Sequence, residues 1–365
     1  SSILRVQCLT DMMKLFIPFV FLSLLSGCVS PPGLENDIYF DQAEISRDEA
    51  PHVANSLEWW YATGWLNDVE SGDTFGIEFV MFHFSMNGRK DRILSNVAIT
   101  DVSSDRFYFD HTLVSLKDQL TADLPINLST SKGKSKASMA GQFGEYEFLA
   151  QGHHEGEVFS YSLNTFPRSP AVLHGNKTGY EDYGGYAKAG YYSYTDLATE
   201  GELIVDGKLR KVKGSIWYDR QWNCGGVLQN RTTGWDWMSI ALNESNEKLM
   251  LYRLRLKEGV NIYGGTLVQE DGIYHSLESE EILIEDQSYW KSQDSGDRYP
   301  NSLRVSIPNY RLDLNLSMLK EEQELAIKIL PLVKLYYWEG MCNVSGTRDG
   351  KPISGTSYLE ITNPE

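Results

Sequence analysis

Three short motifs place a carboxylate among tryptophans. They are Glu58-Trp59-Trp60, Trp217-Tyr218-Asp219-Arg220-Gln221-Trp222 and Trp235-Asp236-Trp237. A carboxylic acid surrounded by aromatic rings keeps its proton, because loss of water disfavours the charged form and raises the pKa. The ring faces also attract a carbocation, by about 0.5–2 kcal/mol per contact. Such an acid could protonate an isolated C=C bond, so Asp219 and Glu58 are candidate catalytic residues and Asp236 is a third carboxylate to consider.

Strand geometry suggests which side chains act together. Residues 217 and 219 point to the same side of a β-strand, so one cavity could receive both Trp217 and Asp219. The candidate ligand-binding residues are the aromatics of these motifs and of a tyrosine cluster: Trp59, Trp60, Tyr192, Tyr194, Trp217, Trp222, Trp235 and Trp237. Structural roles are the alternative. A buried carboxylate can simply accept a hydrogen bond from an indole, tryptophans can close the floor of a barrel, and the tyrosines can lie between barrels.

The elements that would position these residues are predicted to be strands. Aromatic residues make up 12% of the 365 residues, and there are 31 glycines, which together favour short strands joined by tight turns. This aromatic content excludes a disordered chain. Asp-Gly pairs at 206–207 and 349–350 predict two β-hairpins. Residues 320–329 have a helical composition, although the part from 325 to 330 can equally form a strand.

A weak internal repeat indicates two related units. Tyrosine pairs, Asp-Gly-Lys turns and the glycines that follow recur in the same order at offsets of 141 to 145 residues, and each unit opens with a tryptophan-rich strand. The units run from Glu58 to Asp219 and from Trp235 to Glu360. Antiparallel units of this size fit barrels with a ligand cavity. We predict an N-terminal domain over residues 51–226 and a C-terminal domain over 227–365.

The first residues have the features of a targeting signal. Met12, Met13 and Lys14 precede an apolar run from Leu15 to Leu25, which is too short to cross a bilayer as a helix but suits a secretion signal. The run ends in Ser26-Gly27-Cys28, which resembles a bacterial lipobox. We therefore expect residues 1–27 to be removed, Cys28 to be acylated and residues 28–50 to form a tether. The absence of Asp after Cys28 favours the periplasmic face of a Gram-negative outer membrane.

The remaining cysteines, the net charge and the absence of certain motifs bear on other kinds of site and function. Cys224 and Cys342 could form a disulfide in the periplasm, or both could be free thiols. No Cys or His spacing suggests a metal site, and we expect no cofactor. With 33 Lys and Arg against 50 Asp and Glu, the net charge of −17 argues against binding nucleic acid. Neither a nucleophile elbow nor an HExxH motif is present, so hydrolase chemistry has no support in the motifs.

The order of the motifs resembles the AttH/CrtC family, which is similar to carotenoid 1,2-hydratase and is described as lipocalin-like. The resemblance runs from His52 to Thr362. It rests on Glu58 to Gly64, Tyr191 to Thr195, Trp217 to Trp222, Gly234 to Trp237, Tyr299-Pro300, Tyr337 to Gly340 and Gly355 to Thr362. It implies an all-β fold of two lipocalin-like (calycin) antiparallel barrels in tandem, and acid-catalysed hydration of C=C bonds in isoprenoids for members with an assigned activity.

One motif departs from the family pattern. Where members carry a His and a carboxylate, this chain has Arg220 and Gln221. We expect Arg220 to keep Asp219 ionised, which would weaken it as an acid. The leading prediction is therefore a periplasmic lipoprotein that binds an isoprenoid or other lipophilic small molecule in an aromatic barrel cavity, in the service of an ABC-type export system. The alternative is a hydratase or isomerase of the carotenoid hydratase type that acts through Asp219 or Glu58.

Overall fold

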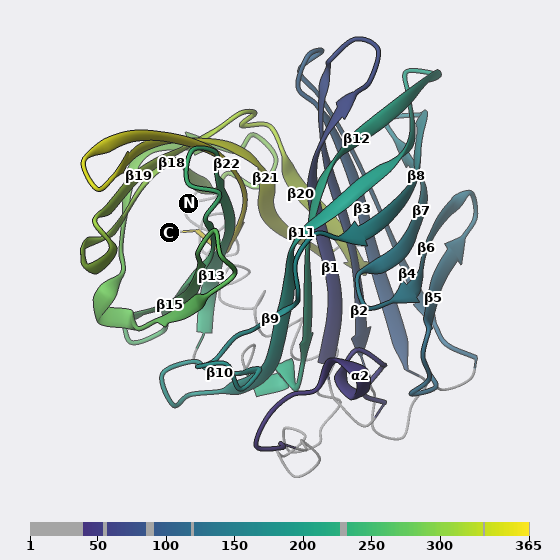
Figure 1. Cartoon of the computed structure of the whole chain (residues 1–365). Helices are drawn as coiled ribbons and strands as arrows, with labels where there is room; N and C mark the ends of the chain where they lie inside the picture. The colour runs from purple at the N-terminus through teal and green to yellow at the C-terminus, as the bar shows by residue number, and fades with distance from the viewer. Residues whose placement is uncertain are drawn as a thin grey trace, which may run out of the picture.

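The computed structural model describes residues 39–53, 57–84, 91–117, 120–226, 232–330 and 333–364. The predicted signal peptide, the acylated Cys28 and the first part of the tether lie outside these ranges. Antiparallel strands dominate and form two curved sheets, which lie side by side (Figure 1). None of the helices in the described ranges is long and apolar enough to cross a membrane.

The first sheet contains twelve strands and belongs to the N-terminal half. They are β1 (Leu57–Asp68), β2 (Thr74–Phe84), β3 (Arg92–Asp101), β4 (Arg106–Ser115), β5 (Ile126–Lys132), β6 (Ser135–Gln142), β7 (Glu145–His154), β8 (Glu157–Pro167), β9 (Val172–Leu173), β10 (Tyr180–Asp182), β11 (Lys188–Val205) and β12 (Lys208–Trp222). The main order is β4-β3-β2-β1-β12-β11-β8-β7-β6-β5, with β9 and β10 paired to β11. Because the edge strand β4 comes close to β5 and β7, the sheet is curled into a nearly closed barrel.

The second sheet contains the other ten strands. They are β13 (Thr232–Leu242), β14 (Lys248–Leu256), β15 (Asn261–Val268), β16 (Tyr274–Leu277), β17 (Leu283–Lys291), β18 (Arg298–Ile307), β19 (Leu312–Met318), β20 (Glu324–Leu330), β21 (Val333–Arg348) and β22 (Lys351–Thr362). The main order is β16-β15-β14-β13-β22-β21-β19-β18-β17, with β20 paired to β21. The segment that could have been helix or strand thus forms the strand β20. The described ranges also contain short helices: α2 (Ile45–Asp48), η2 (Cys224–Gly226), η3 (Ser279–Glu281) and η4 (Pro308–Tyr310).

The two sheets share one connection pattern. In each, the opening strand pairs with the closing strand, β1 with β12 and β13 with β22, and a long hairpin supplies the last two strands. Both hairpins turn at the predicted Asp-Gly pairs. Asp206, Gly207, Asp349 and Gly350 have φ between +52° and +74°, which is the conformation that a two-residue hairpin turn requires. The predicted all-β, lipocalin-like fold is confirmed.

Apolar side chains gather in three clusters. One fills the space enclosed by the first curled sheet, and one fills the space enclosed by the second. The third lies between the sheets and consists of side chains from the outer faces of both. The sheets approach closely there. A Cβ added to Gly76 of β2 would lie 2.4 Å from the Met341 sulfur of β21, so any side chain at this position would have to displace Met341.

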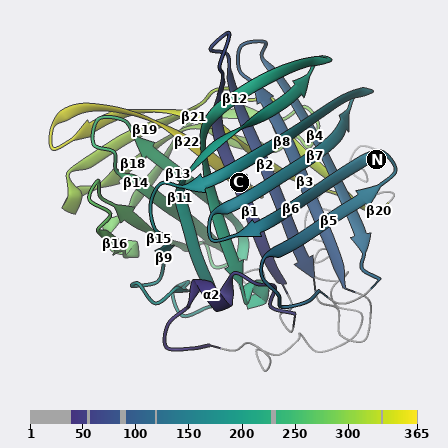
Figure 2. The ribbon, with the colours of Figure 1, turned by 45° about the vertical axis from the view of Figure 1, so that its right-hand side comes forward.

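Residues 39–53, which include α2, pack on the first sheet at the lower end of the barrel in Figure 2. Ala43 and Ala50 are buried, and the fully buried Glu49 accepts hydrogen bonds from the Phe143 backbone N–H and the Tyr146 hydroxyl. The part of residues 28–50 that the structure describes is therefore held against the barrel.

Candidate functional site

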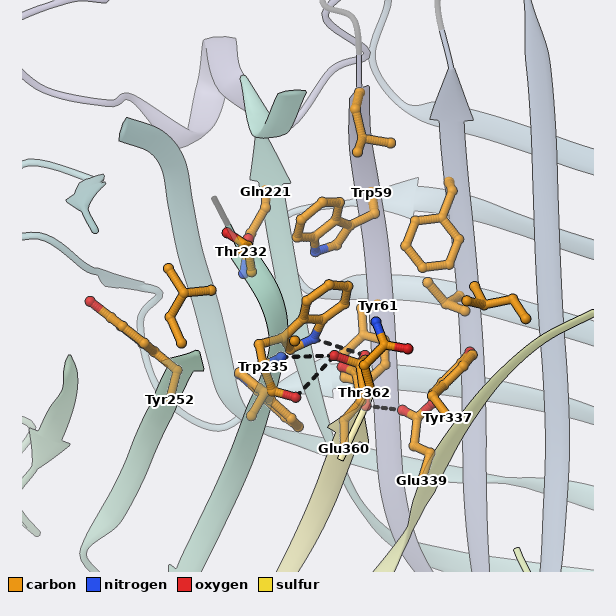
Figure 3. Close-up of a pocket in the computed structure, with 18 of the residues that line it drawn as sticks. Trp59, Tyr61, Gln221, Thr232, Trp235, Tyr252, Tyr337, Glu339, Glu360 and Thr362 are labelled. Carbon is orange, nitrogen blue, oxygen red and sulfur yellow. Dashed lines mark hydrogen bonds between the residues drawn. The ribbon is translucent and has the colours of Figure 1, made fainter. Parts of the chain in front are cut away.

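A cavity of about 180 Å³ lies between the two sheets, and it is lined by aromatic and aliphatic side chains from both. The first half of the chain contributes residues of β1, β2, β3, β11 and β12, and the second half contributes residues of β13, β14, β20, β21 and β22. Figure 3 shows the tryptophans, tyrosines and carboxylates that converge on it. The predicted cavity inside a barrel is therefore corrected: the cavity uses the outer faces of the barrels, because their interiors are filled by packed side chains.

Alternation along the strands divides the predicted aromatic residues into two groups. Trp59, Trp235 and Trp237 line the cavity, and the buried Trp217 lies next to it, 6.3 Å from Trp237 between ring centroids. The remaining four point into the interior of the first barrel: Trp60, Tyr192, Tyr194 and Trp222. These four therefore do not line the cavity. Tyr61 and Tyr191, which were not among the predicted residues, line it in their place.

Asp219 lies in the cavity wall and is 1% exposed. Its Oδ2 accepts a hydrogen bond from the Tyr191 hydroxyl at 2.7 Å, and its Oδ1 accepts from the Trp217 indole at 2.7 Å and from the Ser193 hydroxyl. Burial raises the pKa of Asp219 to about 7, although the three hydrogen bonds act to lower it. A substantial fraction of Asp219 is thus protonated at neutral pH, as an acid that protonates carbon requires.

The hydrogen bonds around Asp219 extend in two directions. Trp237, from the second sheet, donates its indole N–H to the Tyr191 hydroxyl at 2.9 Å. On the other side, Ser193 contacts His174 Nε2 at 2.7 Å. Burial lowers the pKa of His174 to about 3, so this ring is neutral and adds no charge beside Asp219. The carboxyl therefore lies in a connected hydrogen-bond network without a cation in direct contact among the described residues.

The expected pairing of Arg220 with Asp219 is wrong. Neighbouring residues of a strand point to opposite faces, so Arg220 points into the first barrel. There its guanidinium lies 4.2 Å from the centre of the Trp60 ring and forms an ion pair with Glu58, and both partners are 0% exposed. Arg220 therefore does not hold Asp219 ionised.

Glu58 is placed in the same interior network and does not line the cavity. It accepts hydrogen bonds from Arg220, from the His83 ring at 2.8 Å and from the His52 backbone N–H. Burial alone would raise the pKa of Glu58, but the Arg220 charge and the histidine hydrogen bonds outweigh it and hold the pKa well below the usual value. An ionised carboxylate turned away from the cavity cannot protonate a ligand there, so Glu58 has a structural role.

Asp236 also has a structural role. It is fully buried and is held by Arg253 Nε at 2.5 Å and Arg255 Nη1 at 2.6 Å. Among the three carboxylates flanked by tryptophans, Asp219 alone faces the cavity.

Two functional candidates were missed by sequence reasoning. Glu339 and Glu360 lie directly opposite each other on β21 and β22, and both line the cavity. Glu339 accepts a hydrogen bond from the Tyr61 hydroxyl of the first sheet, and Glu360 Oε1 accepts from the Trp235 indole at 3.0 Å (Figure 3). The repeat contained the signal, because it aligns Glu360 with Asp219.

The carboxyls of this second group are kept from ionising together. Burial and the neighbouring Glu78 raise the pKa of Glu339 well above its usual value. Burial and Glu360 raise the pKa of Glu78 to about 8. Burial and nearby carboxylates raise the pKa of Glu360 to about 7, against the Trp235 hydrogen bond. The cavity therefore has proton-holding groups on both walls.

Cys224 and Cys342 are both buried, and neither is in a disulfide. They lie in different clusters, between the sheets and inside the second barrel respectively. Of the two alternatives for these cysteines, the structure therefore contains two thiols that are not joined in a disulfide. The described part of the chain has no group of three or more His, Cys, Asp or Glu side chains placed to hold a metal ion.

Comparisons with known proteins match this architecture. A family model described as AttH-like matches residues 40–364. A crystal structure of a protein from Nitrosomonas europaea described as an AttH superposes with a TM-score of 0.73 at 24% identity, over 92% of this chain and 100% of that one. Kievitone hydratase from Nectria haematococca superposes with a TM-score of 0.64 at 16% identity, over 92% and 95%. CghA, in a structure with Sch210972, gives 0.51 at 12% identity, over 85% and 89%. Comparison with curated protein sequences gives no match.

Proposed function

Because the chain belongs to the AttH-like family, we propose that it binds a lipophilic small molecule between its barrels and protonates a C=C bond of that molecule through Asp219, as a hydratase or isomerase. The observation that carries the proposal is the placement of Asp219: a buried carboxyl with a pKa of about 7 in an aromatic cavity, turned away from Arg220. One structural neighbour is a hydratase by name. At 16% identity that likeness shows the fold alone, so the reaction is argued from the site.

The residues divide the work between binding and chemistry. Leu57, Val80 and Phe82 supply apolar surface for the ligand. Asp219 transfers its proton to one alkene carbon, so that a C–H bond forms and the neighbouring carbon becomes cationic. The faces of Trp59 and Trp235 border the space in which this cation forms, and each contact contributes about 0.5–2 kcal/mol. Water then adds to the cation in a hydratase, or a proton leaves a neighbouring carbon in an isomerase.

The test begins with ligands that copurify with the protein, identified by mass spectrometry, and continues with a panel of isoprenoids. Hydration adds 18 Da to a substrate, and isomerisation changes its retention without a change in mass. Asp219→Asn should retain binding and lose turnover, because the amide has the same shape and no acidic proton. Asp271→Asn, at an exposed turn, is the matched control. Wild-type turnover by Asp219→Asn would remove Asp219 as the acid, and binding without turnover by the wild type would leave a carrier.

The place of action is a second part of the proposal. The lipobox-like Cys28 would anchor the protein at the periplasmic face of a Gram-negative outer membrane, where lipophilic ligands partition and an ABC-type export system could be its partner. Palmitate labelling in a Gram-negative host should mark the wild type and should not mark Cys28→Ser. Equal labelling of both proteins would exclude the anchor, and failure of the wild type to copurify with an ABC transporter would count against that partner.

A further inference from the structure

We propose that Glu360 is the base of the same site and takes a proton from the attacking water, while Asp219, on the facing wall, supplies the proton to carbon. This inference rests on the proposed function and assigns the second half of the reaction. Hydration of an alkene needs both steps, because water that adds to a carbocation must lose a proton. A site with an acid alone would leave that proton without an acceptor.

The first argument is the equivalence of the two carboxyls in the repeated fold. Asp219 lies on the closing strand β12, opposite Tyr61 on one side and Ser193 on the other. Glu360 lies on the closing strand β22, opposite Trp237 and Glu339. The two sheets bring these closing strands to one cavity, so that the closing strand of each half contributes one carboxyl to it.

Hydrogen bonds also connect the two halves across the cavity. Tyr61 of the first sheet donates to Glu339 of the second, and Trp237 of the second sheet donates to Tyr191 of the first, which in turn donates to Asp219. Glu339 is thus contacted directly from the opposite half, and Asp219 is linked to the opposite half through Tyr191, so these hydrogen bonds join the two walls.

The second argument is that Glu360 can be reached. Glu78 and Glu339 are at most 1% exposed, whereas Glu360 and its partner Trp235 retain partial exposure toward the cavity. The Trp235 indole donates a hydrogen bond to Glu360 Oε1. No described group donates to Oε2, so this oxygen can accept from water. Figure 3 shows the Glu360 side chain beside Trp235 at the lower part of the cavity.

The third argument is the neighbouring carboxyls. Glu78 lies against Glu339, and in the described structure its two oxygens accept no hydrogen bond from any other group. None of the three glutamates forms an ion pair with a described Lys, Arg or His. Like charges this close disfavour simultaneous ionisation. The proton is therefore retained by the fully enclosed pair, Glu78 and Glu339, and Glu360 is the member that ionises near neutral pH.

The proposed step balances. The O–H bond of Asp219 breaks and a C–H bond forms. A water oxygen then bonds to the cationic carbon, and one of the water O–H bonds breaks as its proton passes to Glu360. The cycle ends with Asp219 ionised and Glu360 protonated, and exchange with solvent water restores the starting state. The sum is addition of one water to one C=C bond.

The first experiment needs no substrate. The whole protein, with both sheets, is labelled with ¹³C in its Asp and Glu side chains, and its carboxyls are titrated by NMR. Because the two carboxyls share a cavity, Glu360→Gln should lower the midpoint of Asp219, and Asp219→Asn should lower the midpoint of Glu360. Glu181→Gln is the control: Glu181 is a buried glutamate outside the cavity whose burial raises its pKa to about 7, and its Tyr252 hydrogen bond can be kept by the amide. Midpoints that do not respond to each other would overturn the pairing.

The second experiment uses citronellol, a small isoprenoid with one isolated C=C bond, in D₂O and in H₂¹⁸O. Asp219→Asn should lose both deuterium uptake into recovered alkene and ¹⁸O uptake into alcohol. Glu360→Gln should keep the deuterium uptake, but its rate of ¹⁸O uptake should fall at least tenfold. Glu360→Asp should recover part of the ¹⁸O uptake. Full hydration by Glu360→Gln would overturn the inference. If wild-type protein leaves citronellol and the isoprenoid panel unchanged, the proposed function fails, while the titration still decides whether the two carboxyls are coupled.

Discussion

Burial of Asp219 has a consequence for stability that reverses with pH. The pKa of this carboxyl is 3.8 in an unfolded chain and about 7 in the folded protein. Between these values the unfolded state has lost the proton that the folded state keeps, so folding becomes less favourable as the pH rises from about 4 to about 7. Above pH 7 the full penalty is present, and below pH 4 it is absent.

The magnitude follows from the shift. A displacement from 3.8 to about 7 corresponds to about 4 kcal/mol of lost stability at pH 8, as an order of magnitude. Asp219→Asn removes this penalty because an amide does not ionise. The variant also has a cost. Its amide oxygen can still accept from Trp217 and Ser193, but its amide group faces the Tyr191 hydroxyl, which now lacks an acceptor, at about 1 kcal/mol. We expect a net gain of about 3 kcal/mol at pH 8 and a net loss of about 1 kcal/mol at pH 4.

The assay is urea unfolding of wild type and variant at pH 4, 6 and 8, followed by tryptophan fluorescence. Asp271→Asn is the control, because an exposed side chain has no burial penalty to relieve. The reasoning requires the difference between variant and wild type to change sign between pH 4 and pH 8. An equal difference at all three values would show that Asp219 is ionised in the folded protein, and the proposed acid would be lost with it.

Three further substitutions test the packing around the site. Glu58→Gln leaves the buried Arg220 charge without its partner and should cost about 3–5 kcal/mol in urea unfolding above pH 5; a loss below 1 kcal/mol would contradict the ion pair. Gly190→Ala places a Cβ 1.9 Å from the Trp222 ring and should lower the melting temperature by several degrees, which calorimetry would measure. Burial raises the pKa of the Cys342 thiol, so a thiol reagent at pH 8 should modify it only in urea, and rapid reaction in the folded state would contradict its burial.

Much of the fold could be predicted from local signals. The Asp-Gly turns define both long hairpins, and the repeat indicates two equivalent sheets. The turn at Asp349 and Gly350 also sets the register of β21 and β22, which alone places Glu339 opposite Glu360. Alternation along β12 likewise separates Asp219 from Arg220. These last two results follow from hairpin register and strand alternation, which the motifs that defined the predicted site do not express.

Other features depend on contacts that no local pattern encodes. The turn at Asp206 and Gly207 would place Tyr194 opposite Asp219 in a regular hairpin. A bulge between Tyr194 and Leu197 shifts the register, so that Ser193 occupies that position and donates to the carboxyl. The cavity itself depends on how two outer faces pack, and side-chain alternation says which residues share a face without saying what covers it.

The duplication explains why the cavity lies between the barrels. Inside the first barrel, the Arg220 guanidinium lies 4.2 Å from the centre of the Trp60 ring and 5.8 Å from that of Trp222, and it pairs with Glu58 among packed side chains. The opposite faces of the same strands carry aromatic rings that a single barrel would expose to water. Packing the two sheets against each other buries those rings and brings the carboxyls of both closing strands, Asp219 and Glu360, against one apolar space (Figure 1). Burial then raises the pKa of both, so the same contact that stabilises the pair of barrels also prepares the acid.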